Sequence, residues 1–290
     1  KNMNVVIEDD SKKNKKLKFI YICILLICII SIVIAVIIQL SGGNNTKQTG
    51  ENKTSLPSLS DDQVSQHKNE FDNIFTNKVN YLENNSYKVS KIKQDQEIIY
   101  LGYNSKETKL NDYELNVNIP YININNEIID EFNTDIKDTF EKKAKSIIDS
   151  QNNNVIYTVN YSAYVSNNIL SLVVRSTLKE GSNNPQRDIV QTYNYDLSNQ
   201  KKVTIDDMLE LKGITKKEAN QKIKEEIKLV QQKVENFKKL GYNIYERDYT
   251  NDMYSVNNVT EYFMGENNAL YIIYAYGNKN YTSEMDIVVM

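Results

Sequence analysis

An uncharged apolar run near the N-terminus is the feature that most constrains this chain. Phe19 to Leu40 comprises 22 residues without one charged side chain, FIYICILLICIISIVIAVIIQL. At about 1.5 Å of rise per residue, a helix of this length spans a hydrocarbon layer of about 30 Å. A single segment crosses a bilayer only as a helix, because its backbone polar groups must be satisfied internally. The sequence therefore predicts one transmembrane helix over residues 19–40.

The charges that flank this run predict its orientation. Residues 1–18 carry a net charge of +3, residues 41–290 carry -6, and the whole chain carries -3. A basic flank stays in the cytoplasm. We therefore expect a single-pass protein of the cell membrane, with a cytoplasmic basic stub at 1–18 and the C-terminal part outside. The chain begins with Lys1 rather than methionine, which leaves open further cytoplasmic residues upstream.

A cleaved signal peptide is the alternative interpretation of the same run. Its apolar core would be longer than the usual 7–15 residues of such peptides, so an anchor is favoured. Ser41 and Gly43 nevertheless place small residues two positions apart at the outer edge. These two residues are the candidate signal peptidase cleavage site, which is compatible with an anchor that is cut under regulation.

Composition excludes several classes of function for the part outside the membrane. An acidic balance argues against nucleic acid, because phosphate binding requires a basic face. Both cysteines, Cys23 and Cys28, lie inside the apolar run, so the outer part has no disulfide. His67 is the single histidine, and no phosphate-binding loop occurs. We therefore expect no catalytic residues, no cofactor and no metal site, and the chain is not expected to be an enzyme.

The outer part divides into three predicted segments. Residues 41–61 are a polar linker rich in Gly, Ser and Asn, which has nothing to bury. Residues 62–86 read as a stalk helix capped by Asp61 or Asp62, with apolar residues at helical spacing up to Leu82. A compact domain is expected over residues 87–290.

Within this domain the pattern predicts an α+β fold, an antiparallel sheet with two main helices on one face. Alternation of apolar residues predicts strands, and apolar residues three and four apart predict an amphipathic helix over 126–150. Thr215 and Glu218 form a capping box for a second long helix, which Gly241 ends. Predicted strands are 87–103, 114–122, 155–165, 169–178, 188–197, 261–264, 269–276 and 283–290.

A tyrosine-rich segment follows the second helix. Tyrosine offers a large, stiff contact area and a hydroxyl, which suits surfaces that recognise proteins. The alternative is that these rings only pack the loop onto the sheet. The acidic residues among them favour a basic protein partner. The candidate partner-binding residues are Tyr242, Tyr245, Tyr249, Asp252 and Tyr254.

Three stretches carry a resemblance to a known family. They are Asn118-Ile119-Pro120 before an Asn-rich turn and a helix, residues 193–197 (YNYDL) followed by 204–209 (TIDDML), and residues 261–263 (EYF) through 270–273 (LYII) with the closing strand. In order and spacing they resemble the extracytoplasmic domain of RsiV-type anti-sigma factors. This domain is of unknown function and is shared with PdaC-type peptidoglycan deacetylases. The resemblance covers about residues 87–290.

The resemblance implies a membrane-anchored sensor. In such proteins the outer domain binds lysozyme, signal peptidase cuts near the membrane, an intramembrane protease cuts next, and a bound sigma factor is released. Residues 1–18 are too short to mask a sigma factor by themselves, so this reading needs residues upstream of Lys1. The alternative is an anchored cell-envelope protein with a structural or binding role and no signalling. A deacetylase reading fails for want of a catalytic domain.

Overall fold

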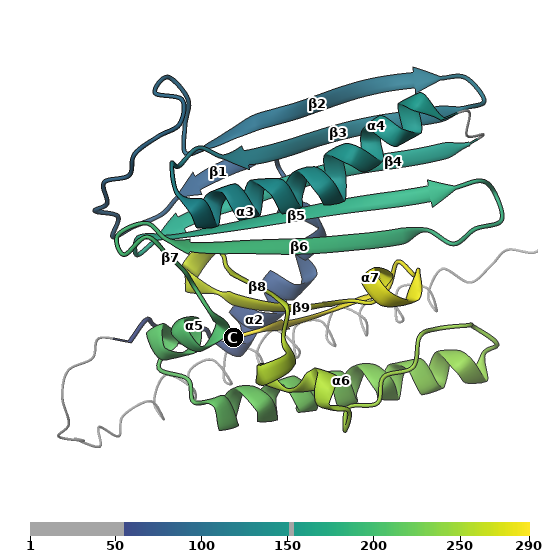
Figure 1. The fold of residues 1–290 in the computed structure, drawn as a ribbon. Coiled ribbons are helices and arrows are strands. Elements are labelled where there is room, and N and C mark those ends of the chain that lie inside the picture. Colours follow the sequence, from purple (N-terminus) through teal and green to yellow (C-terminus); the bar gives the residue numbers. More distant parts are fainter. Residues whose placement is uncertain (1–54, 151–153) are drawn as a thin grey trace, which may run out of the picture. The chain divides into compact units, whose positions relative to one another are not determined.

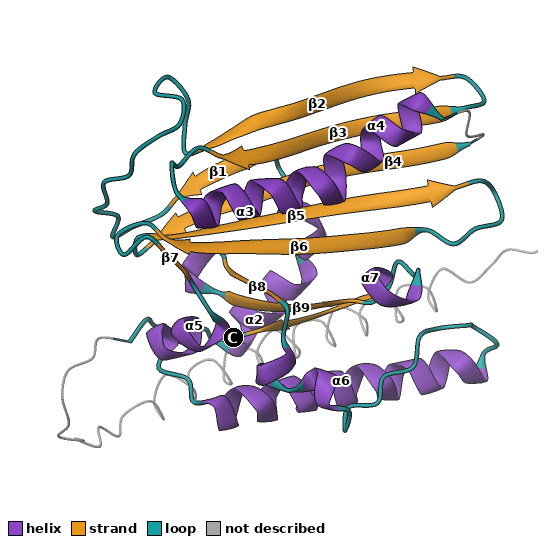
Figure 2. Cartoon of the chain, viewed as in Figure 1, coloured by secondary structure: helices purple, strands orange, loops and turns teal. Residues whose placement is uncertain are grey.

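The computed structural model describes residues 55–150 and 154–290, which together build four packed layers (Figures 1 and 2). One helical layer covers a seven-stranded sheet, whose other face packs on a three-stranded sheet. A second helical layer covers the far face of the small sheet. The α+β class is confirmed. The two predicted main helices, however, cover different sheets and do not share one face.

The large sheet is mixed, where the sequence predicts an antiparallel one. Its order is β2-β3-β4-β5-β6-β7, and β1 pairs with β4. β4 is parallel to both β3 and β1, and the other pairs are antiparallel. The strands are β1 (Lys78–Tyr81), β2 (Ile99–Lys109), β3 (Tyr113–Ile122), β4 (Val155–Ser166), β5 (Ile169–Glu180), β6 (Arg187–Asp196) and β7 (Lys201–Lys202).

A helical crossover explains the parallel pair β3–β4. The chain leaves β3 and returns through α3 (Glu127–Ile136), a π-helical segment (Lys137–Glu141) and α4 (Lys142–Asp149). A crossover of this length brings the chain back to its starting end, so the next strand runs parallel. The Asn126 side chain accepts from Ile128 N at 3.0 Å and caps α3 at its predicted start. Buried residues from Ile129 to Ile147 pack this helical layer on the sheet.

The small sheet is antiparallel, in the order β10-β9-β8, with β8 (Glu261–Met264), β9 (Leu270–Ala275) and β10 (Met285–Val289). Backbone groups on the outer edge of strand β8 form hydrogen bonds with side chains of the large sheet. Asn194 Nδ2 donates to Tyr262 O at 2.7 Å, and Met264 N donates to Ser171 Oγ at 3.1 Å. These bonds fix one sheet on the other and close an edge that would otherwise expose unpaired backbone groups.

The second helical layer consists of α5 (Ile205–Lys212) and α6 (Lys216–Lys239). Each of these two helices begins with a capping box, Thr204 with Asp207 and Thr215 with Glu218. Ala219, Ile223 and Ile227 bury the first half of α6 against the small sheet. Gly241 follows the helix with φ +88°, which confirms the predicted stop. A short helix α7 (Gly277–Asn280) separates β9 from β10.

The predicted stalk helix is wrong beyond Asn69. α2 spans Asp61–Asn69 only, a short 3-10 turn follows at Phe71–Asn73, and residues 78–81 form β1. Phe71 is 3% exposed and packs among rings of both sheets. Lys68 Nζ lies 2.5 Å from Glu226 Oε2 on α6. The spacing of the apolar residues is typical of a helix. The residues after Asn69 instead pack against the two sheets, so the helix stops there. Thr54–Met290 thus forms one compact unit that includes this segment.

Several predictions concern residues outside the described part of the chain. The stub at 1–18, the segment Phe19–Leu40, most of the linker, and the candidate cleavage residues Ser41 and Gly43 all lie there. Among residues 55–150 and 154–290, no helix is both long and apolar enough to cross a bilayer.

Candidate functional site

The tyrosine-rich loop runs from Gly241 to Thr260, beside α6 (Figure 1). It has no strand and contains only two 3-10 turns, Asp252–Tyr254 and Val256–Asn258. A loop of about twenty residues without regular structure is typically either functional or disordered. The contacts that this loop makes with the rest of the domain therefore determine whether it is ordered.

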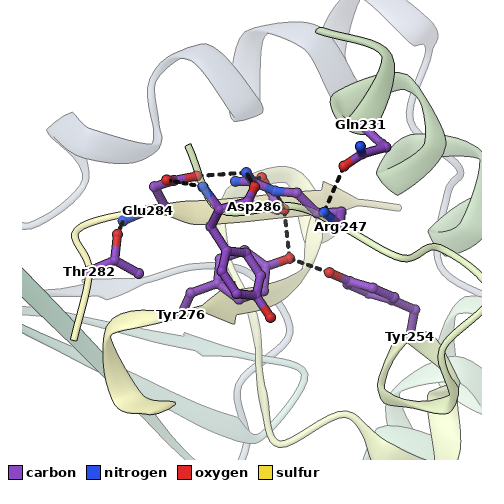
Figure 3. A network of polar contacts seen from close by, with 8 residues as sticks. Gln231, Arg247, Tyr254, Tyr276, Thr282, Glu284 and Asp286 are labelled. Carbon is purple, nitrogen blue, oxygen red and sulfur yellow. Dashed lines mark hydrogen bonds and ion pairs between the residues drawn. The ribbon is translucent and has the colours of Figure 1, made fainter. Parts of the chain in front are cut away.

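A buried arginine at the centre of the loop provides the main anchor (Figure 3). Arg247 Nε donates to Asp286 Oδ2 at 2.8 Å, and Nη2 donates to Asp286 Oδ1 at 3.1 Å. The side chains of Arg247 and Asp286 are only 4% and 6% exposed. Arg247 Nη1 also donates to Glu284 Oε2 at 2.6 Å and to the Tyr245 carbonyl oxygen. The loop is thereby tied to strand β10 and to the residue that precedes it.

Two tyrosines complete this network. Tyr276 OH donates to Asp286 Oδ2 at 2.7 Å, and Tyr254 OH lies 2.7 Å from Tyr276 OH. Burial raises the pKa of Tyr276, and the Asp286 charge raises it further. Burial likewise raises the pKa of Tyr254 to about 12. Burial lowers the pKa of Arg247, but hydrogen bonding to Asp286 outweighs it and the net pKa is raised. Both phenols are thus neutral and the guanidinium is charged at neutral pH.

Further contacts fasten the loop to α6 and to the small sheet. Arg247 N donates to Gln231 Oε1 at 2.6 Å, and Val256 N donates to Asn220 Oδ1 at 2.8 Å. The Tyr245 ring packs on the Tyr276 ring, with centroids 4.3 Å apart. Side chains thus replace the backbone hydrogen bonds that regular structure would supply. The loop is held along its length by elements on both sides.

The outer side of this assembly exposes large apolar and aromatic side chains. Leu240 is 73% exposed, Tyr242 60%, and Phe237 48%. The rings of Phe237 and Tyr242 meet edge to face at 5.8 Å. We define the exposed α6 surface as Leu229, Phe237, Leu240, Tyr242 and Tyr249. Contiguous apolar patches on a protein surface often mark interaction sites, and Phe237 and Tyr242 are in contact here.

The predicted partner-binding residues separate into two groups. Tyr242, Tyr249 and Asp252 are exposed, whereas Tyr254 is 1% exposed and serves the buried network. Tyr245 is half-buried and lies between the two groups. The packing interpretation therefore holds for Tyr254, and the exposed residues stay candidates for recognition.

The acidic side chains of the loop are partly engaged within the chain. Asp248 Oδ1 accepts from Thr250 N at 3.0 Å, and Glu246 pairs with Lys238. Lys228 lies over the Tyr249 ring, 5.8 Å from its centroid. Positive charge from α6 therefore stands beside the negative charge of the loop. The charges around the loop are thus mixed and do not by themselves favour a basic partner.

Sequence reasoning missed Arg247, Glu284 and Asp286. One signal was present, because this lysine-rich chain contains only three arginines, Arg175, Arg187 and Arg247. Arginine suits buried, two-point pairing with carboxylates better than lysine does. Arg175 also pairs with a buried aspartate, Nη2 to Asp188 Oδ2 at 2.6 Å. Two of the three arginines, Arg175 and Arg247, thus pair with buried aspartates, whereas Arg187 lies over the Tyr281 ring.

No group of three or more His, Cys, Asp or Glu side chains in the described part of the chain is arranged to hold a metal ion. The adjacent carboxylates Asp206 and Asp207 serve α5. Asp207 Oδ2 accepts from the N-cap Thr204 N at 2.7 Å and its Oδ1 lies 3.0 Å from Lys201 Nζ, while Asp206 lies 2.7 Å from Lys216 Nζ. The two carboxylates therefore take part in helix capping and in surface ion pairs.

Comparison with known proteins finds similarity among solved structures. No protein-family model matches the sequence, and no curated protein matches it significantly. Among solved structures, the chain is similar to the crystal structure of a DUF3298 family protein from Pseudomonas aeruginosa. The match has 13% sequence identity and a TM-score of 0.39, and it covers 71% of this chain and 90% of that one. At this degree of similarity, no function follows from the comparison.

Proposed function

We propose that this chain is a membrane-anchored extracytoplasmic sensor that binds a protein ligand through the exposed α6 surface. The observation that carries the proposal is the contrast within one loop. Arg247 and Tyr254 are buried and hold the backbone, while Tyr242 and its neighbours stand exposed. Rings held in place before binding lose little conformational freedom on association, which favours affinity.

The finer proposal concerns signalling. The sequence resemblance to RsiV-type anti-sigma factors supports lysozyme as the ligand and release of a sigma factor by regulated proteolysis as the output. Residues 55–150 and 154–290 contain no group of three or more His, Cys, Asp or Glu side chains that could hold a metal ion. We propose a binding role and not an enzymatic one.

The ligand is tested with the full chain in detergent, immobilised and exposed to lysozyme. We expect saturable binding at micromolar lysozyme or below. Replacing an exposed ring at the centre of an interface costs at least about 1–2 kcal/mol, so Tyr242→Ala should weaken binding about tenfold. Leu240→Ser should weaken it as well.

Leu110→Ser is the matched control, because Leu110 is 86% exposed but lies in the β2–β3 turn, far along the chain from α6. It should leave binding unchanged. No binding by the wild type removes lysozyme as the ligand. Binding that is equal in Tyr242→Ala, Leu240→Ser and wild type removes the exposed α6 surface as the site.

The signalling output is tested through the gene itself. A sigma-factor gene beside this one, and a sigma-binding segment encoded upstream of Lys1, are expected. Their absence would favour the alternative, an anchored envelope protein that binds its ligand without signalling.

A further inference from the structure

A polar cavity of about 500 Å³ lies away from the exposed α6 surface. α2 and the residues that follow it form one wall, β1 forms a second, and the turn between β8 and β9 forms a third. The volume falls within the range of small-molecule sites, about 300–1,000 Å³. These walls come from segments nearly two hundred residues apart in sequence, so only the folded chain creates the cavity.

The innermost lining residues are aromatic and half-buried or buried. Tyr271 is 3% exposed and Tyr164 is 4% exposed, and Tyr271 OH lies 2.8 Å from His67 Nδ1. Burial lowers the pKa of His67, although the charges of Glu266 and Glu70 oppose this, so the imidazole is neutral at neutral pH. Burial raises the pKa of Tyr271, which keeps its hydroxyl protonated. When that hydroxyl donates to Nδ1, the imidazole proton lies on Nε2, which has no hydrogen-bond partner among the described residues.

The outer lining residues carry unused hydrogen-bonding capacity. Within residues 55–150 and 154–290, the side chains of Asn73, Thr76 and Asn267 make no hydrogen bond, although all three line the cavity. An amide side chain both donates and accepts, which matches the hydroxyl groups of a polyol. The cavity therefore suits a ligand that is rich in hydroxyl groups over one that is mainly apolar.

Two carboxylates also line the cavity. Glu266 has no ion-pair partner among the described residues, and Glu70 accepts only from Gln66 Nε2, at 3.1 Å. Lys78 is the basic residue of the lining. Two carboxylates against one ammonium leave an excess of negative charge, which favours a ligand that carries an amine.

We propose that this cavity binds an amino sugar of one or two rings, through the carboxylates of Glu70 and Glu266, the amides around them and the aromatic floor. Glu70 belongs to the α2 segment, and Glu266 belongs to the β8–β9 turn. Because one ligand would contact both, its binding would stabilise the docked position of α2. This site is separate from the proposed protein-binding surface and does not depend on it.

The test uses the full chain in a detergent without a sugar headgroup, titrated with the β-1,4-linked glucosamine dimer. Cellobiose is the matched probe, since it has the same rings and linkage with hydroxyls in place of the amines. We expect the amino sugar to bind about tenfold more tightly than cellobiose. Glu266→Gln should reduce its affinity about fivefold, and Glu70→Gln should act in the same direction.

Hydrogen exchange gives a second readout. Saturating amino sugar should slow amide exchange in residues 61–69 and leave exchange in α3 unchanged. Glu235→Gln, on the exposed side of α6, is the control and should bind as the wild type does. Equal affinity for both sugars, no binding at millimolar amino sugar, or full affinity in Glu266→Gln would each overturn the proposal.

Discussion

Arg247 and Asp286 form an ion pair with two hydrogen bonds, which joins an irregular loop to the last strand, β10. Neither group can be hydrated in place, because both side chains are buried. Partial opening of the loop would leave one charge without its partner in a poorly solvated position, which is costly. The loop should therefore be more rigid than its lack of helix and strand implies.

Asp286→Asn is expected to lower the free energy of unfolding by about 3–5 kcal/mol. The substitution keeps the shape of the side chain but leaves the buried Arg247 cation with Glu284 as its one remaining carboxylate. Urea unfolding measures the loss, and hydrogen exchange in residues 242–258 should accelerate at the same time.

The matched control for this prediction is Tyr254→Phe, which removes only the hydroxyl that meets Tyr276 OH. It should cost about 1 kcal/mol, as one hydrogen bond does. An Asp286→Asn protein within about 0.5 kcal/mol of wild type would show that the ion pair does not stabilise the loop.

Local features of the fold could be predicted from sequence. The start of α6 depends on Thr215 and Glu218, and its end depends on Gly241, all of which act within one turn of the chain. The β8–β9 hairpin and the helix that begins after Asn126 are equally local. Their residues carry the relevant signal themselves, so periodicity and capping were sufficient.

Long-range features could not be predicted in this way. Alternation along β4 indicates one buried face, yet it does not show that the other face, with Tyr164, is buried against a second sheet. In the loop, Tyr242 and Tyr254 have the same residue type, and spacing does not show which one reaches Tyr276. Whether a tyrosine is buried depends on residues distant in sequence, and local spacing carries no information about them.

Tyr242 and Tyr254 should differ sharply in their effect on stability. Tyr242 is 60% exposed, so Tyr242→Ala should change the free energy of unfolding by no more than about 0.5 kcal/mol. Tyr254 is 1% exposed, and Tyr254→Ala should cost about 3–5 kcal/mol through the cavity that it leaves. Thermal unfolding of both variants measures the contrast. Similar losses in the two would mean that the exposed α6 surface is part of the core.

Glu261 should make stability depend on pH in an unusual direction. Its Oε2 accepts from Thr192 N at 2.7 Å, but burial outweighs this bond and raises the pKa of Glu261 to about 7. In the unfolded chain the pKa is about 4.3. Between these two pKa values the folded state binds more protons than the unfolded state. The contribution of Glu261 to the free energy of unfolding is therefore complete below about pH 4.3 and is lost as pH rises through about 7.

Glu261→Gln should remove that dependence, because glutamine stays neutral while its carbonyl oxygen can still accept from Thr192. At pH 8 the variant should be about 2 kcal/mol more stable than wild type, and near pH 4 the two should be nearly equal. Urea midpoints at both pH values measure the difference. A variant that is less stable than wild type at pH 8 would contradict the raised pKa.

Gly277 should tolerate no side chain, because it lies where α7 meets β6. A Cβ at this position would meet the Asp188 carbonyl oxygen and would lie 2.5 Å from Thr282 O, both of them backbone atoms that cannot rotate away. Gly277→Ala should therefore cost about 3 kcal/mol. Gly181→Ala is the matched control, since Gly181 has φ +67° but no atom within 4 Å of an added Cβ. That variant carries only the left-handed backbone cost, about 1 kcal/mol.

Urea unfolding should rank wild type, Gly181→Ala and Gly277→Ala in falling order of stability. The reverse order of the two variants would contradict the close approach of α7 to β6.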